Sequence, residues 1–280
     1  MSEPKSWDCV IVGGGVAGLS AALVLGRARR RTLLFDLGGQ SNRAAPHVGG
    51  GLALDGTPPD ELYARGRAQV AAYDSVLVRD AEVTDAQRDA DGFVLGLGDG
   101  SDEIRARSLI LATGMDYQVP DVPGFAEHWG GSVFHCPFCH GWEVRDRKLA
   151  IYAGEDKAEH LSALAHGWSD DVTVVQPEEI AELRAEDGIL QCLVRHDGSE
   201  VPCDAVLVHA PMHRRDSLAE TLGLELTEDG RVAVDGLCQT SVPGVYAAGD
   251  LAVAPQQVAI AAGSGHLAGL MVVRELLLGR

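Results

Sequence analysis

The sequence predicts an α/β protein, and three stretches carry that prediction. Residues 7–36 consist of an apolar strand, a glycine-rich turn, a helical stretch and a second apolar strand, and the same order returns at 149–183. Residues 245–277 read as a short strand, a Gly-Asp pair and a long helix with regularly spaced apolar residues. Strands that alternate with helices are typical of a parallel sheet covered by helices.

The composition indicates a soluble globular chain, with 280 residues, 46% of them apolar and 23% charged. The net charge of -18 leaves no basic surplus for a phosphate backbone, so we expect no nucleic-acid partner. The apolar stretch from Val10 to Gly26 holds five glycines and follows acidic residues, which favours a buried strand-turn-helix over an export signal or a membrane span. We therefore expect a cytoplasmic protein without a membrane partner.

The first turn has the glycine spacing of a dinucleotide site. Gly13 allows the tight turn, Gly15 lets a pyrophosphate approach the backbone, and Gly18 lets the helix pack against the strand. The helix N-terminus supplies N–H donors to the anion, and Asp36 ends the second strand, where it can accept hydrogen bonds from a ribose. This motif alone does not distinguish FAD from NAD.

Two further segments resemble the pyridine-nucleotide disulfide oxidoreductases. The segment from Thr240 onward resembles that family's second FAD motif, and "LILATG", Leu109 to Gly114, matches its short crossover segment. The resemblance implies FAD as the cofactor, with an aspartate on its ribityl chain and the C-terminal helix pointing its N-terminus at the flavin. The residues assigned to FAD by this resemblance are Thr113, Gly114, Gly249, Asp250, Gln257 and Val258.

Within that family the order of motifs is most similar to the low-molecular-weight thioredoxin reductases, because the Cys-x-x-Cys lies in the middle of the chain. The resemblance implies two Rossmann-like domains of the three-layer ββα type. One is a discontinuous FAD-binding domain at 1–118 and 237–280, and the other is an inserted NAD(P)-like domain at 119–236 that carries the Cys-x-x-Cys. It also implies a homodimer.

Residues 136–140 read "CPFCH", for which three chemical interpretations exist: a c-type haem attachment site, half of a zinc site, or a redox dithiol with a neighbouring histidine. A haem site needs an exported protein, and zinc needs a second Cys/His pair that is not evident, so we expect no metal. A dithiol, Cys136 and Cys139, fits a flavin scaffold. The other four cysteines lie in or beside apolar runs and are expected to be small buried hydrophobic residues: Cys9, Cys192, Cys203 and Cys238.

His140 stands where thioredoxin reductases carry an acid. A histidine with a pKa of about 6.5 accepts a proton at neutral pH far better than a carboxylate, which favours deprotonation of an incoming thiol. Cys-Pro-x-Cys-His-Gly with an aromatic residue and Glu resembles the gliotoxin and holomycin dithiol oxidases, as does the segment that holds Asn42, Arg43 and His47. That resemblance places Asn42 and Arg43 at the cofactor. His47 assists His140, binds substrate or is a structural loop residue.

The inserted domain has lost the residues that hold a nucleotide. Where the family has G-x-G-x-x-A, this chain has the segment 153–158, in which Glu155 replaces the glycine that admits the pyrophosphate. After the next strand, Pro177-Glu178-Glu179 replaces the cationic run that grips a 2′-phosphate, although an acid there could suit the 2′-hydroxyl of NADH. We expect neither nicotinamide nucleotide to bind productively.

The resemblance implies an FAD-dependent dithiol oxidase, which closes a disulfide in a small-molecule dithiol and passes the electrons to O2, giving H2O2. In this scheme substrate attacks Cys136, and Cys139 faces the flavin. One alternative is a disulfide reductase that is fed by NADH or by another protein. A second is a redox sensor or dithiol-binding module without turnover. The pattern does not identify the dithiol.

Overall fold

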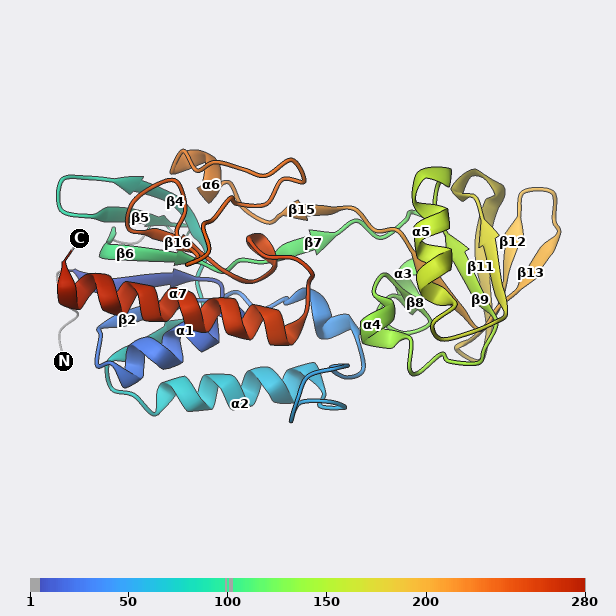
Figure 1. Ribbon diagram of the computed structural model, residues 1–280, viewed down its shortest axis with the longest axis horizontal. Coiled ribbons are helices and arrows are strands. Elements are labelled where there is room, and N and C mark those ends of the chain that lie inside the picture. Colours follow the sequence, from blue (N-terminus) through green and yellow to red (C-terminus); the bar gives the residue numbers. More distant parts are fainter. Residues whose placement is uncertain (1–5, 99, 101–102, 280) are drawn as a thin grey trace. The chain divides into compact units, whose positions relative to one another are not determined.

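The structure is a computed structural model that describes residues 6–98, 100 and 103–279. By their contacts these residues divide into two compact units (Figure 1). The first unit holds the described residues of Met1–Ser41, Asp60–Asp116 and His213–Arg280, and the second holds Asn42–Pro59 and Tyr117–Met212. The chain passes from one unit to the other along two strands that pair with each other, β7 (Met115–Tyr117) and β15 (Met212–Arg214).

The first unit is built on a seven-stranded sheet in the order β3-β2-β1-β6-β5-β4, with β16 also paired to β6. The strands β3, β2, β1, β6 and β16 are parallel, and β4 and β5 form an antiparallel extension. Apolar side chains fill the central strands, because these strands are buried on both faces. The bounds are β1 Trp7–Val12, β2 Thr32–Phe35, β3 Val76–Arg79, β4 Val83–Arg88, β5 Phe93–Leu97, β6 Ile104–Leu111 and β16 Val245–Ala247.

Two helices, α1 (Val16–Arg27) and α7 (Val258–Leu278), lie side by side in this unit (Figure 1). A Cβ on Gly265 would overlap the carbonyl oxygen of Ala17, so only glycine permits this approach. Of the helices described, α7 is the one long and apolar enough to cross a membrane, yet its small-residue face packs against α1. Three more helices belong wholly or mainly to this unit: α2 Pro59–Ala71, α6 Leu218–Thr221 and η3 Gly249–Leu251. The short helix η1, Ser41–Ala44, begins at the last residue of the first unit's N-terminal segment and lies mainly in the second unit.

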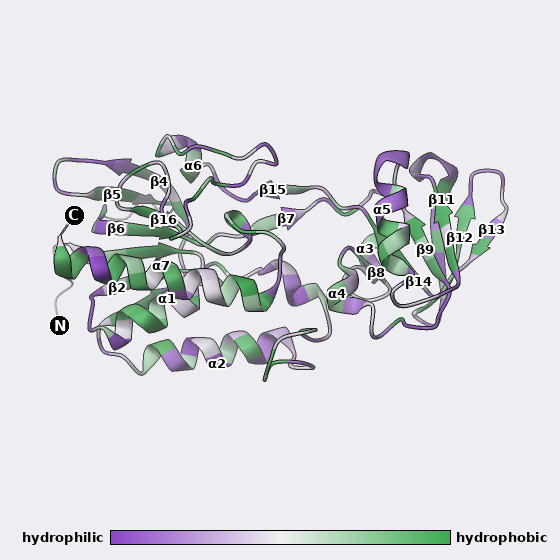
Figure 2. Ribbon diagram, in the orientation of Figure 1, coloured by the Kyte–Doolittle hydropathy of each residue, from purple (hydrophilic) through white to green (hydrophobic). Residues whose placement is uncertain are grey.

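The second unit has three layers. A parallel sheet in the order β10-β9-β14-β8 lies between helix α5 and an antiparallel sheet, β11-β12-β13. In each unit the central strands are hydrophobic, for example β2 and β9, whereas strands farther out, such as β4 and β11, are mixed (Figure 2). The bounds are α3 Phe125–His128, β8 Val133–Phe134, α4 Pro137–His140, β9 Leu149–Tyr152, α5 Glu155–Ala165, β10 Val172–Val175, η2 Pro177–Glu179, β11 Ile180–Glu186, β12 Ile189–Arg195, β13 Glu200–Pro202 and β14 Ala205–Val208. The predicted fold, two Rossmann-like α/β units, is confirmed.

The units are divided at different residues from the domain limits expected from sequence. The chain returns to the first unit at His213, whereas the limit expected from sequence lay at residues 236 and 237. The segment between them already bonds to the first unit: Arg215 donates to the carbonyl of Gly39, and the Val232 amide to that of Leu251. Residues 42–59 belong by contacts to the second unit.

Candidate functional site

The glycine-rich turn in the first unit has backbone angles and close contacts that disfavour residues with a side chain. Gly13 has a φ of +104°, and a Cβ on Gly18 would overlap the carbonyl oxygen of Gly13. Gly15 is the N-cap of α1, and the atom nearest to a Cβ built on it is Cγ of Gln40, at 3.9 Å. No acidic residue lies in the first turn of α1. The turn is therefore an uncharged cradle for an anion at a helix N-terminus.

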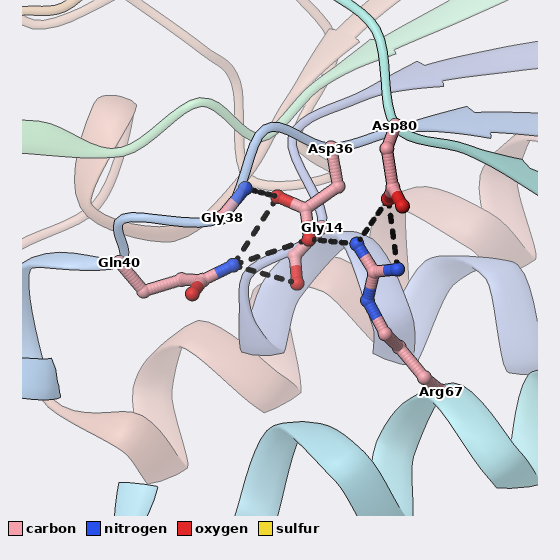
Figure 3. Close-up of polar contacts among 6 residues, drawn as sticks. All are labelled: Gly14, Asp36, Gly38, Gln40, Arg67 and Asp80. Carbon is pink, nitrogen blue, oxygen red and sulfur yellow. Dashed lines mark hydrogen bonds and ion pairs between the residues drawn. The ribbon is translucent and has the colours of Figure 1, made fainter. Parts of the chain in front are cut away.

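Asp36 follows β2 and is only 6% exposed. Its carboxylate accepts hydrogen bonds from the Gly38 amide at 3.1 Å and from Gln40 Nε2 at 3.2 Å (Figure 3). Arg67, which comes from α2, forms an ion pair with it at 2.6 Å and also contacts Asp80 at 2.9 Å. The sequence predicted Asp36 at this place but gave no signal for Arg67.

The other half of the cradle lies at the ends of β6 and β16. Asp250 is largely buried, and this burial raises its pKa to about 6, against the opposing charges of Arg215 and Arg231. The side-chain atoms Thr113 Oγ1 and Gln256 Nε2 are buried without a partner among the described residues. A buried carboxylate and unpaired polar atoms need donors and acceptors that a ribityl chain and flavin edge would supply. The residues present thus fit FAD.

Most of the residues that the sequence assigned to FAD lie in the first unit, after the ends of neighbouring strands or at the N-terminal ends of α1 and α7. The Ala112 amide bonds to Val12, and the Ala248 amide bonds to Leu111, which aligns these strand ends. The residues in this unit are Gly13, Gly15, Gly18, Asp36, Thr113, Gly114, Gly249, Asp250, Gln257 and Val258. Gln257 is the N-cap of α7 and Val258 its first residue. Asn42 and Arg43 fall in the second unit, so their role toward FAD stays a prediction.

The dithiol lies in the second unit, on the single-turn helix α4. Cys136 is its N-cap, 9% exposed, and its carbonyl accepts from the amides of Cys139 at 3.1 Å and His140 at 3.2 Å. Cys139 is partly exposed. A Cβ on Gly49 would overlap the Cys139 carbonyl oxygen, so the loop that precedes α2 packs directly on the backbone of the helix that carries the dithiol. The four remaining cysteines are buried, as predicted.

His140 is held in one tautomer. Its Nε2 lies 3.1 Å from the carbonyl oxygen of Gly130, which can only accept, so Nε2 carries the hydrogen. The ring stacks on Phe134 at 5.4 Å, and Nδ1 is buried without a hydrogen-bond partner among the described residues. Burial is the largest effect on His140 and lowers its pKa, so the ring is neutral at pH 7 with its lone pair on Nδ1.

Two titratable side chains, those of Glu143 and His47, act electrostatically on His140. Glu143 raises its pKa and His47 lowers it, and these two form a pair with 2.9 Å between His47 Nε2 and Glu143 Oε1. The loop residue His47 thus lies near the dithiol helix α4 and is connected to it through its pair with Glu143. In the sequence, Glu143 is only the last residue of the motif around the dithiol. The motif gave no signal for its pairing with His47.

A third histidine was also missed by sequence reasoning. The ring of His135 contacts the rings of Tyr117 at 4.0 Å and Trp129 at 5.6 Å, and these two rings also lie 6.1 Å from each other. Burial, followed by the charge of His140, lowers the pKa of His135 to about 4. Among the described residues, no group of three or more His, Cys, Asp or Glu could hold a metal ion.

Comparison with known proteins agrees with this geometry. The chain matches the family model of the pyridine nucleotide-disulphide oxidoreductases over residues 7–176 and 163–265. It is 34% identical to the thioredoxin reductase tcpT of Claviceps purpurea, over 99% of this chain and 96% of that protein. It is 32% identical to the thioredoxin reductase aclD of Aspergillus oryzae, over 96% of each.

Two solved structures have the same fold over nearly the whole chain. HlmI superimposes with a TM-score of 0.93 at 34% identity, covering 99% of this chain and 94% of HlmI. An oxidoreductase from Agrobacterium tumefaciens gives 0.90 at 32% identity, covering 98% and 100%. Together with the FAD cradle and the dithiol, these matches show that the chain belongs to the pyridine nucleotide-disulphide oxidoreductase family, as a thioredoxin-reductase-like flavoprotein with FAD as its cofactor.

Proposed function

We propose that this protein is a dithiol oxidase, which closes a disulfide in a small-molecule dithiol and transfers the two electrons to O2, giving H2O2. The observation that carries the proposal is the proton acceptor beside the dithiol. A neutral histidine, with its lone pair on a buried and unpartnered Nδ1, directly follows Cys139. An acceptor of this kind suits a reaction in which substrate arrives as a thiol and leaves as a disulfide.

The reaction starts from the Cys136–Cys139 disulfide. A substrate thiolate attacks Sγ of Cys136, which forms a mixed disulfide and releases Cys139 as a thiolate. The second thiol of the substrate then attacks the substrate sulfur of the mixed disulfide and expels Cys136 as a thiolate. The product disulfide closes, and both cysteines are left reduced. The second attack is intramolecular, which favours dithiols over monothiols.

His140 handles the proton of the attacking thiol. The Nε2–H bond to Gly130 fixes the ring, so that Nδ1 is the atom that takes the proton. Its lowered pKa keeps the ring neutral and ready as a base at pH 7. Glu143 stabilises the imidazolium that forms, and His47 holds Glu143 at 2.9 Å. When bound in the first unit, FAD supplies the two-electron acceptor that links the reduced dithiol to O2.

The rival function is a disulfide reductase that takes electrons from NADH or from a protein. Relatives that carry the name thioredoxin reductase favour this rival. A redox sensor or binding module without turnover is a further alternative. We also propose a homodimer, as the family resemblance implies.

Anaerobic spectroscopy separates these functions. NADPH and NADH should leave the flavin absorbance of the holoprotein unchanged over minutes, whereas dithiothreitol should bleach it, and admitted air should restore it with formation of H2O2. Cys139→Ser should stay yellow but resist bleaching by dithiothreitol. Rapid bleaching by either nucleotide would establish the reductase, and bleaching by dithiothreitol without steady O2 uptake would leave a sensor.

A further inference from the structure

The base of the proposed reaction is held by the turn that precedes β8 and by β8 itself. Nε2 of His140 lies 3.1 Å from the carbonyl oxygen of Gly130, and the ring stacks on Phe134 of β8 at 5.4 Å. The Gly130 amide donates to the carbonyl oxygen of Val133, the first residue of β8, at 2.9 Å. One turn and the strand that follows it therefore supply two contacts that orient the imidazole ring.

The backbone of Gly130 disfavours any side chain at this position. Its φ is +81°, in the left-handed region that favours glycine. A Cβ built on Gly130 would lie 2.5 Å from the carbonyl carbon of Ala44 and 2.8 Å from the amide nitrogen of Ala45. These are backbone atoms, which cannot rotate away as the end of a flexible side chain can. The neighbouring Gly131 differs, because a Cβ on it would meet its nearest atom, the carbonyl oxygen of His128, at 3.5 Å, an ordinary contact distance.

The loop segment of residues 44–49, the strap, also contacts the dithiol helix α4 and the turn after it. His47 Nε2 lies 2.9 Å from Glu143 Oε1, and a Cβ on Gly49 would lie 2.2 Å from the carbonyl oxygen of Cys139. By their contacts the strap and α4 belong to the same unit. The strap therefore meets the surroundings of the base at three points.

We propose that the strap holds the base of the reaction in place and that Gly130 is the positioning residue through which it acts. The strap packs on the backbone of Gly130, which keeps the carbonyl directed at Nε2 of His140. With Nε2 as the hydrogen-bond donor, the basic lone pair is confined to Nδ1. The proposal rests on the assignment of His140 as the base of a dithiol oxidase, and it adds that a loop distant in sequence orients that base.

A side chain at position 130 should therefore impair the base without removing it. In the holoprotein, Gly130→Ala should lower kcat for oxidation of dithiothreitol about 10-fold or more and change KM less than about 3-fold, because the base is displaced while the dithiol is kept. Gly49→Ala pushes the strap away from its other end and should have the same effect, even if Gly130→Ala folds poorly. Gly131→Ala is the matched control and should keep the wild-type rate.

Two measurements separate positioning from a merely structural role. In heteronuclear NMR spectra of histidine-labelled protein, the Nε2–H signal of His140, assigned by its absence in His140→Ala, should shift or weaken in Gly130→Ala and Gly49→Ala and stay in Gly131→Ala. The rate loss should also be smaller with bis(2-mercaptoethyl) sulfone, whose thiols are more acidic than those of dithiothreitol and need less help from a base. A general loss of stability would reduce the rates for both dithiols equally.

Three results would overturn the proposal. Wild-type rates in both Gly130→Ala and Gly49→Ala would show that His140 does not depend on the strap. Reduced rates with an unchanged Nε2–H signal would make the two glycines structural, and a raised KM at constant kcat would make the strap part of the substrate site. If the wild-type protein oxidises no dithiol with O2, the proposed function fails, whereas the NMR signal still decides whether the strap orients His140.

Discussion

The two units contain the same strand-turn-helix-strand arrangement, but the turns differ in shape and in charge. Each turn begins alike: the Gly13 amide bonds to the carbonyl of Phe35 at 2.8 Å, and the Ala153 amide to that of Val175 at 3.5 Å. Counted from these bonds, Glu155 takes the place of Gly15. Helix α5 begins at Glu155, one residue earlier in this register than α1.

Charge separates the two turns as clearly as shape. The first turn of α1 has no acidic residue, whereas α5 begins with Glu155 and Asp156, both exposed. Glu178, which follows β10, adds to the burial that raises the pKa of Tyr152. Acidic side chains at a helix N-terminus stabilise the helix but repel phosphate. The comparison teaches that a Rossmann-like unit keeps its fold when the residues at its anion-facing turn change in size and charge.

The change with the largest expected effect places the glutamate of the second turn at the corresponding position of the first turn. Gly15→Glu should reduce FAD affinity by about 10³-fold or more, because the carboxylate would occupy the cradle and repel the pyrophosphate. Flavin content after purification measures the loss. The matched change, Glu155→Gly, should keep full flavin content. A yellow Gly15→Glu protein would show that this turn does not hold the pyrophosphate.

We expect proton transfer to take place in the second unit, and substitution of His140 tests this expectation. His140→Ala should keep FAD and the dithiol but slow dithiol oxidation by about 10²-fold. The wild-type rate should hold below pH 6.5, because burial lowers the pKa of His140 and the base protonates only at more acidic pH. The variant should recover partly at high pH, where substrate thiols ionise unaided. An equal rate at every pH would make His140 structural.

Acid should destabilise the second unit through His135. Its pKa is lowered to about 4, so between pH 6.5 and 4 the unfolded chain binds a proton that the folded chain does not. Stability is therefore lost as the pH falls through this window, by on the order of 2 kcal/mol at pH 5. His135→Phe should remove this part of the loss, measured by thermal melts at pH 7.5 and 5. Identical acid sensitivity in the variant would contradict the assignment.

The smallest expected effect belongs to Glu143 and His47. Glu143→Gln keeps the size of the side chain but removes the charge that raises the pKa of His140, so the acidic limb of the rate profile should move to lower pH. The maximal rate should fall by about 3- to 10-fold. His47→Ala should lower the rate by removing the partner of Glu143. The loss of rate in the double variant should therefore be smaller than the two single losses combined. Fully additive effects on the rate would show that the two residues act independently of each other.

The local sequence was enough to predict the glycine-rich turn after β1 and the segments at the N-terminal and C-terminal ends of the first unit. The spacing of the three glycines is fixed because a strand, a tight turn and a helix follow one another within a few residues, as at Gly13, Gly15 and Gly18. This constraint acts only between neighbours along the chain. The apolar runs of β1, β16 and α7 likewise follow from their own residues. The dithiol on α4 and the histidine after it were also evident from their order in the chain.

Tertiary structure decided the partners of these residues. Arg67 meets Asp36 across 31 positions because β2 and β3 lie next to each other and α2 brings Arg67 to Asp36 and Asp80, which follow these two strands. Glu143 meets His47 across 96 positions because the loop around Gly49 packs on the dithiol. Backbone turns and periodicity are set by neighbours along the chain, but an ion pair depends on which strands lie side by side, and a single sequence carries no local pattern for that choice.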